Sequence, residues 1–119
     1  MKTFNFKLFG GYTVKIDKTD VTVDYAGEKW LFITRAKPRT KTIVFDDILR
    51  VEYKESGSLA FGYVRFITKE NEAYPSSSYV AQHDENAFMI EKDEVEKLNE
   101  VLDVLKKQLK NIQFVYMKA

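Results

Sequence analysis

The chain has 119 residues, a length that predicts a single domain. Apolar residues make up 45% of it and aromatic residues 14%, and its 19 Lys and Arg residues nearly balance its 18 Asp and Glu residues. This composition excludes a disordered chain and argues against a nucleic-acid partner. Because there is no Cys and only one His, disulfides, zinc–thiolate sites and multi-histidine metal sites are excluded. We therefore expect no metal and no cofactor.

The N-terminal part of the sequence predicts β-strands. Apolar and polar residues alternate in segments 4–8, 12–16 and 21–25, which is the period of a half-buried strand. The run 30–33, Trp-Leu-Phe-Ile, is apolar at every position. Such a run predicts a strand covered on both faces, or on one face and by a partner.

The β pattern extends through the middle of the sequence. Further strands are predicted at 42–45, 48–54, 59–68 and 87–90. Gly62, inside the third of these, indicates a bulge or a close approach of another backbone segment. Residues 69–86 are polar, with a weak indication of strand around 74–82.

The C-terminal part predicts one amphipathic helix over residues 93–111. Apolar residues recur there every three or four positions, and acidic residues gather at its start and lysines at its end. Asp93 and Glu96 have the spacing of a capping box. Because no second helix is predicted, the apolar face of this helix must pack on a sheet or fill the open end of a bent sheet. Residues 114–116 either extend the helix or form a tail.

Three segments, in their order and spacing, resemble the bacterial pleckstrin-homology-like (PH-like) domain family. They are VTVDYAG at 21–27 leading into LFITR at 31–35, IVFDDILRV at 43–51, and SGSLAFGYVRF at 56–66, followed by NAFMI at 86–90 and the helix. The resemblance covers roughly residues 20–110. It implies a mainly β (α+β) fold, in which about seven strands form bent antiparallel sheets or a partly open barrel and one C-terminal amphipathic helix covers an opening.

In terms of this resemblance, residues 1–119 form a single PH-like domain. Residues 20–91 supply the strands, residues 93–111 supply the helix, and residues 1–18 add an extra N-terminal strand or hairpin. The resemblance leaves function open, because this fold serves lipid binding, peptide binding and self-assembly alike.

The candidate binding residues are Arg35, Lys37, Arg39 and Lys41. No acidic residue lies between positions 30 and 45. If this stretch is a hairpin tip, its four cations would project from one end and could meet an anionic lipid, another anionic ligand or an acidic protein surface. The alternative is an ordinary solvated loop. Members of the wider superfamily that bind inositol lipids carry basic residues in the loop after the first strand, which here would be 26–29 with one lysine and one acid, so the resemblance argues against such lipids.

Two further groups of residues suggest chemistry. His83 and Asp84, with serines at 76–78, suggest a hydrolase, but neighbouring residues of an extended segment point to opposite sides, which favours a polar loop. The pair Asp46–Asp47 suggests acid–base chemistry or a metal, but its position before a strand favours a turn.

We therefore predict a protein that is not an enzyme. The preferred function is that of a cytoplasmic interaction or assembly module, and the alternative is a peripheral binder of anionic lipid or another anionic ligand through residues 35–41. No apolar run reaches the roughly 18 residues of a membrane span, and the N-terminus does not read as a signal peptide. Self-association is an open possibility, because the alternating run 4–9 could pair within its own sheet, which we favour, or with a second copy.

Overall fold

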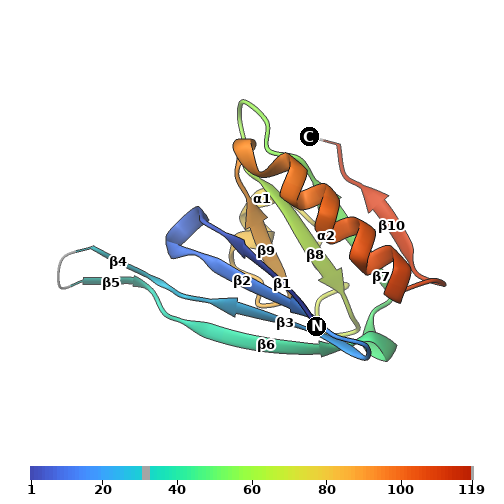
Figure 1. Cartoon of the computed structure of the whole chain (residues 1–119). Coiled ribbons are helices and arrows are strands. Elements are labelled where there is room, and N and C mark those ends of the chain that lie inside the picture. Colours follow the sequence, from blue (N-terminus) through green and yellow to red (C-terminus); the bar gives the residue numbers. More distant parts are fainter. Residues whose placement is uncertain (31–32, 119) are drawn as a thin grey trace.

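The computed structural model describes residues 1–30 and 33–118. It contains two four-stranded sheets and a separate two-stranded sheet. Figure 1 shows the two larger sheets facing each other, with the long C-terminal helix across one side. The predicted mainly β architecture with a C-terminal helix is therefore confirmed.

The first sheet has the order β1-β2-β3-β6. Its strands are β1 (Lys2–Phe6), β2 (Tyr12–Ile16), β3 (Asp20–Tyr25) and β6 (Arg39–Val44). Alternate residues of β2 and β3 are buried, as the period-two pattern predicted. The prediction that the N-terminal run pairs within its own sheet is confirmed, since β1 pairs antiparallel with β2. The hairpin β1–β2 is thus an integral half of this sheet.

The second sheet has the order β10-β7-β8-β9. Its strands are β7 (Arg50–Lys54), β8 (Gly62–Ile67), β9 (Ala87–Ile90) and β10 (Gln113–Tyr116). Every residue of β8 and β9 is buried, so these strands are covered on both faces. Phe88 of β9 lies with its ring centroid 5.0 Å from Phe6 of β1 and 6.2 Å from Phe66 of β8, which places the core between the two sheets.

The strand predicted at 59–68 begins only at Gly62, and Leu59 is 98% exposed. A Cβ atom at position 62 would collide with the backbone of residues 54–56. Gly62 therefore marks the predicted close approach of two backbone segments, and any other residue there would force β8 away from the end of β7.

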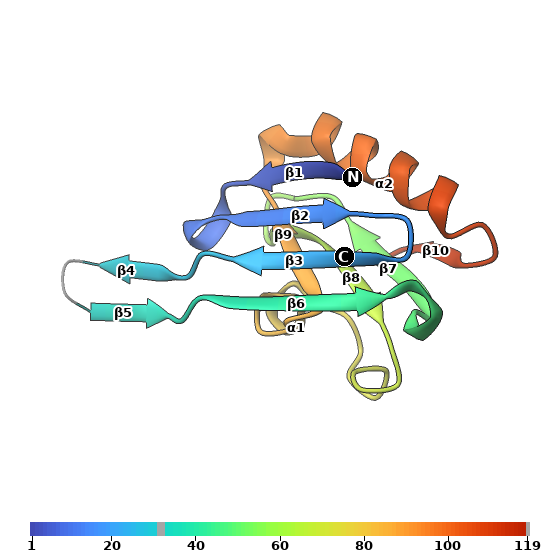
Figure 2. The ribbon, with the colours of Figure 1, turned by 60° about the horizontal axis from the view of Figure 1, so that its bottom comes forward.

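The run 30–33 does not form one covered strand. It is divided between β4 (Glu28–Trp30) and β5 (Ile33–Ala36), which pair as a hairpin extending from the first sheet (Figure 2). Ile33 is 61% exposed, so the expectation of burial is wrong for this residue. Leu31 and Phe32 lie outside the described residues.

The predicted helix is α2 (Val95–Gln108), which buries Leu98, Val101, Leu102 and Leu105. It bridges the edges of both sheets. Near its start, the Lys97 ammonium donates to the Asn5 carbonyl of β1 at 2.6 Å. Near its end, Lys106 lies over the Phe114 ring of β10. Strand β10 itself, which runs parallel to β7, replaces the helix extension or tail expected for residues 114–116.

The start of the helix differs from the prediction. A short 3₁₀ turn, η3 (Lys92–Glu94), precedes α2, and the capping box is formed by Glu91 and Glu94. The predicted box of Asp93 and Glu96 is therefore wrong. The Asp93 carboxylate instead accepts a hydrogen bond of 2.6 Å from Lys7, and this pairing lowers the pKa of Asp93.

We predict that Leu105→Ala lowers the free energy of unfolding by about 2–5 kcal/mol, the usual cost of truncating a fully buried leucine. Leu105 is completely buried in the apolar face that joins α2 to both sheets. Urea unfolding followed by circular dichroism measures the change. Val104→Ala, at a half-buried position of the same helix, is the control with a smaller expected loss. Equal stability of wild type and Leu105→Ala would mean that α2 is not part of the core.

Candidate binding surface around α1

The segment between β8 and β9 covers the face of the second sheet that points away from the first. It contains the short helix α1 (Ser78–Gln82), where the residue pattern weakly indicated a strand. The Ser77 hydroxyl caps this helix by accepting from the Val80 amide at 3.1 Å, and Ala81 is buried. A helix of this length is too short to be stable alone, so tertiary contacts must hold it in place.

Arg65 supplies the main contacts. It stands in the centre of β8, opposite Glu52 of β7 and Ala87 of β9, and it is 1% exposed. Its Nε donates to the Asp84 carboxylate at 2.6 Å. Its Nη1 donates to the Tyr74 carbonyl at 2.7 Å and to the Ser76 hydroxyl at 2.9 Å, and its Nη2 donates to the Asn71 carbonyl at 3.0 Å. One side chain therefore fixes four points of the segment.

Asp84 is the second centre of this network. Besides Arg65, its carboxylate accepts from the Asn71 amide group at 2.9 Å and from the Asn86 backbone amide at 2.8 Å. Asn71 in turn donates to the Phe66 carbonyl of β8 at 3.0 Å. Both ends of the segment are thus joined to the sheet through charge-assisted hydrogen bonds, the stronger kind.

Glu52 extends the network to β7. Its carboxylate accepts from the Arg50 Nε at 2.8 Å and from the Ser76 hydroxyl. Burial alone would raise the pKa of Glu52. The hydrogen bonds from Ser76 and Arg50, with the charges of Arg50 and Arg65, outweigh burial and leave the pKa below its ordinary value.

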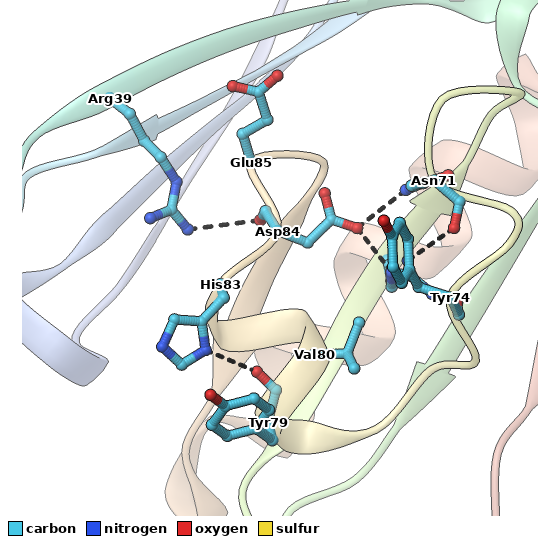
Figure 3. Close-up of a pocket in the computed structure, with 9 residues that line it drawn as sticks. Arg39, Asn71, Tyr74, Tyr79, Val80, His83, Asp84 and Glu85 are labelled. Carbon is cyan, nitrogen blue, oxygen red and sulfur yellow. Dashed lines mark hydrogen bonds and ion pairs between the residues drawn. The ribbon is translucent and has the colours of Figure 1, made fainter.

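On top of this network the segment presents exposed aromatic side chains. Tyr79 is 73% exposed and Tyr74 is 64% exposed. The Tyr79 carbonyl lies 2.9 Å from the His83 Nδ1, and the two rings lie 4.6 Å apart. Figure 3 shows these side chains together with Asp84 among the residues that line a hollow. This Tyr74 hollow has a volume of about 470 Å³ and is also lined by Arg39 and Glu85.

A second hollow, the Lys37 hollow, adjoins the first and shares Arg39 and His83 with it. Its volume is about 610 Å³. It lies between α1 and the first sheet, and its lining includes Phe9 of the turn η1 (Leu8–Gly10), Tyr25 at the end of β3, and Lys37. The surface around α1 therefore consists of two adjoining hollows, with His83 between them and aromatic rings around them.

The four predicted binding residues do not form a hairpin tip, since they run from β5 through a short connection into β6. Arg39 donates to the Gln82 carbonyl at 3.2 Å and lies over the Tyr25 ring at 4.6 Å. Lys41 pairs with Glu85 at 3.2 Å and with Glu70 at 3.6 Å. Lys37 is exposed and has no ion pair with any described residue. The side chain of Arg35 lies outside the described part.

The residues that suggested a hydrolase have separate partners. The Asp84 carboxylate binds Arg65 and Asn71, whereas His83 contacts the Tyr79 carbonyl. The pair Asp46–Asp47 lies in the 3₁₀ turn η2 (Phe45–Asp47), in agreement with the turn interpretation. Among the described residues, no group of three or more His, Asp or Glu side chains is placed to hold a metal ion.

Sequence reasoning missed the role of Arg65 and of the two exposed tyrosines. The available signal was a single cation inside an otherwise apolar strand, since a buried charge requires partners. Burial raises the pKa of Tyr12, whose ring stacks on that of Tyr25, to about 12, although the charge of Arg39 opposes the rise. The Tyr12 hydroxyl therefore stays protonated at neutral pH.

Comparison with models of protein families, with curated proteins and with solved structures found no match to this protein. Within residues 1–30 and 33–118, no helix has both the length and the apolar character that crossing a membrane requires.

We predict that Arg65→Met destabilises the protein by about 3–5 kcal/mol, because it leaves the Asp84 carboxylate buried without its charged partner. Chemical unfolding gives the free energy, and amide hydrogen exchange should show the earliest loss of protection in residues 71–86. Adding Asp84→Asn to Arg65→Met should recover part of the loss, since the uncompensated charge is then gone. A single variant as stable as wild type would rule out the network as the anchor of this segment.

We predict that Glu52 contributes to the acid sensitivity of the fold. Because its folded pKa lies below its ordinary value of 4.5, its contribution is complete above that pH and disappears as the pH falls through the lowered folded pKa. Unfolding free energies of wild type should therefore fall more steeply than those of Glu52→Gln between about pH 5 and pH 3. Parallel curves for the two proteins would contradict this assignment.

Proposed function

We propose that the protein is a cytoplasmic, non-enzymatic interaction module that binds a protein partner through the surface around α1. The single observation that carries this proposal is the pair of exposed tyrosines, Tyr74 and Tyr79, held beside two adjoining hollows. Tyrosine, tryptophan and arginine dominate the energetic centres of protein interfaces, because they combine a large apolar area with a polar end.

The way in which the segment is held supports the proposal. Four hydrogen bonds from Arg65 hold the segment: two reach the backbone carbonyls of Asn71 and Tyr74, and two reach the side chains of Ser76 and Asp84. A partner therefore meets aromatic side chains on a backbone that is already ordered. Less conformational entropy is lost on binding to such a surface than on binding to an unordered loop.

We further propose that the fold is of the PH-like type. The support is the order of the elements: the four strands β1, β2, β3 and β6 precede the three strands β7, β8 and β9, and α2 follows them. In this assignment the first strand is β1 rather than β3. The hairpin β4–β5 and the strand β10 are then additions to the seven-strand pattern.

The alternative function, binding of an anionic lipid or another anionic ligand, is favoured by the presence of Lys37 and Arg39 in one hollow. A headgroup with several negative charges requires several free cations, however, and Lys41 is already paired with Glu70 and Glu85. We therefore place the protein partner first. Flotation with phosphatidylcholine vesicles, with and without phosphatidylserine, separates the two functions.

We predict that Tyr79→Ala reduces the amount of partner that the tagged protein retains from its native host by about tenfold or more, as expected for a central interface tyrosine. Leu49→Ala, which truncates an exposed side chain outside both hollows, is the matched control and should retain the partner fully. Light scattering on the same variants shows whether the partner is a second copy of this protein. Equal recovery of the same partner by both variants would remove this surface from consideration.

A further inference from the structure

The Lys37 hollow combines fixed positive charge with apolar walls. Lys37 and Arg39 both line it, and Glu28 is the acid in its lining. Much of the remaining wall is apolar and comes from Phe9, the Tyr25 ring, Ala36 and Pro38. The hollow therefore carries a small positive excess rather than a dense cluster of cations.

Arg39 is held in one position before any ligand arrives. Its guanidinium lies 4.6 Å from the Tyr25 ring centroid, and its Nη2 donates to the Gln82 carbonyl at 3.2 Å and to the Asp84 carbonyl at 3.4 Å. The Tyr12 hydroxyl also lies beside this guanidinium, and among the described residues Nε and Nη1 make no other close hydrogen bond. A half-buried guanidinium held in a fixed plane is suited to a carboxylate, which can accept a charged hydrogen bond from its Nη1 or its Nε.

The balance of charges distinguishes between anionic ligands. A headgroup with several phosphates needs several free cations, and here Lys41 is already paired with Glu70 and Glu85. The lining of the Lys37 hollow has two cations, Lys37 and Arg39, and one acid, Glu28. A single carboxylate would balance the one positive charge that remains. The apolar wall then remains for a side chain next to that carboxylate, which a peptide supplies and a free anion does not.

We infer that the Lys37 hollow binds an acidic peptide segment of the protein partner, with its carboxylate on Arg39 and Lys37 and a neighbouring apolar side chain against Phe9 and Tyr25. This inference rests on the proposed function, because it names the chemistry of the partner at that same surface. The carboxylate can come from an acidic side chain or from the C-terminus of a polypeptide, and the two sources call for different probes.

His83 provides a direct readout. It is the only histidine of the protein, and it lines both hollows, so its ring protons give resolved NMR signals that report on this surface. The probes are capped tetrapeptides that each contain a single Glu. The Glu stands directly before or directly after a Phe, Tyr, Trp or Leu. Each has a counterpart with Gln in place of Glu, and a further set has a free C-terminal carboxylate and no Glu.

We expect at least one carboxylate peptide to shift the His83 signals saturably, with a dissociation constant on the order of 1 mM. Its Gln or C-terminally amidated counterpart should bind at least about tenfold more weakly, because charged hydrogen bonds are lost. Lys37→Gln should weaken binding by about two- to fivefold, as for an exposed ion pair. Lys18→Gln, in the exposed turn between β2 and β3, should leave binding unchanged.

Arg39→Gln should weaken binding by about tenfold or more. Since Arg39 also supports α1, that variant could unfold, and Lys37→Gln then decides alone, because the Lys37 side chain is exposed and unpaired among described residues. The inference is overturned if no peptide shifts His83 saturably, if the uncharged counterparts bind equally, or if Lys37→Gln has no effect. It is also overturned if inorganic phosphate or phosphatidylserine vesicles, but not the peptides, act on His83.

The peptide titrations and the partner-recovery experiment can fail independently of each other. A partner that is lost in Tyr79→Ala while the peptides fail to bind would keep the surface and refute the acidic segment. A partner that is retained by Tyr79→Ala while the peptides bind normally would refute the Tyr79 surface as the partner's site and leave a carboxylate-binding hollow.

Discussion

The hydrogen bonding of one buried guanidinium determines how one side of this protein is organised. Arg65 stands in the central strand of the second sheet with almost no exposed surface. A charge in that position is tolerated only when its donors are satisfied, and here the acceptors come from Asn71, Tyr74, Ser76 and Asp84. The segment between β8 and β9 therefore has to fold back over the sheet. Without it, the guanidinium would be uncompensated, and the outer face of β8 and β9 would be open to water.

The position of α1 follows from this constraint, and so does the shape of the candidate site. Because the network holds the base of the segment, Tyr74 and Tyr79 can point outwards without contributing to the core. The first sheet reaches the same segment through Arg39 and Lys41, which contact residues 82–85. The two hollows thus lie where a polar segment of one sheet meets the edge strand of the other. Such junctions between packed layers are usual places for binding sites.

The features that the sequence predicts correctly are those with a regular period. Alternation indicated β2 and β3, and the spacing of three and four indicated α2, because burial of one face produces both patterns. The start of α2 was misplaced by two residues, since Glu91–Glu94 and Asp93–Glu96 share the same spacing. Helix α1 and strand β10 leave no periodic signal. The first is held by side chains distant in sequence, and the second is a four-residue edge strand that depends on β7 for its pairing.

The basic stretch shows why composition alone could not define the candidate site. In a strand, residues two apart share a face, so Arg39 and Lys41 both point towards the segment around α1, whereas Thr40 and Thr42 bond to Asp24 and Thr22 of the neighbouring strand. Lys37 precedes β6, so it escapes this alternation and stays exposed. Lys41 therefore stabilises the fold through its ion pairs, whereas Lys37, four positions earlier, is exposed and available to a ligand. The Lys37 hollow therefore has little net charge. In the proposed binding mode, the arrangement of Arg39 against Tyr25 would matter more for selectivity than the number of cations.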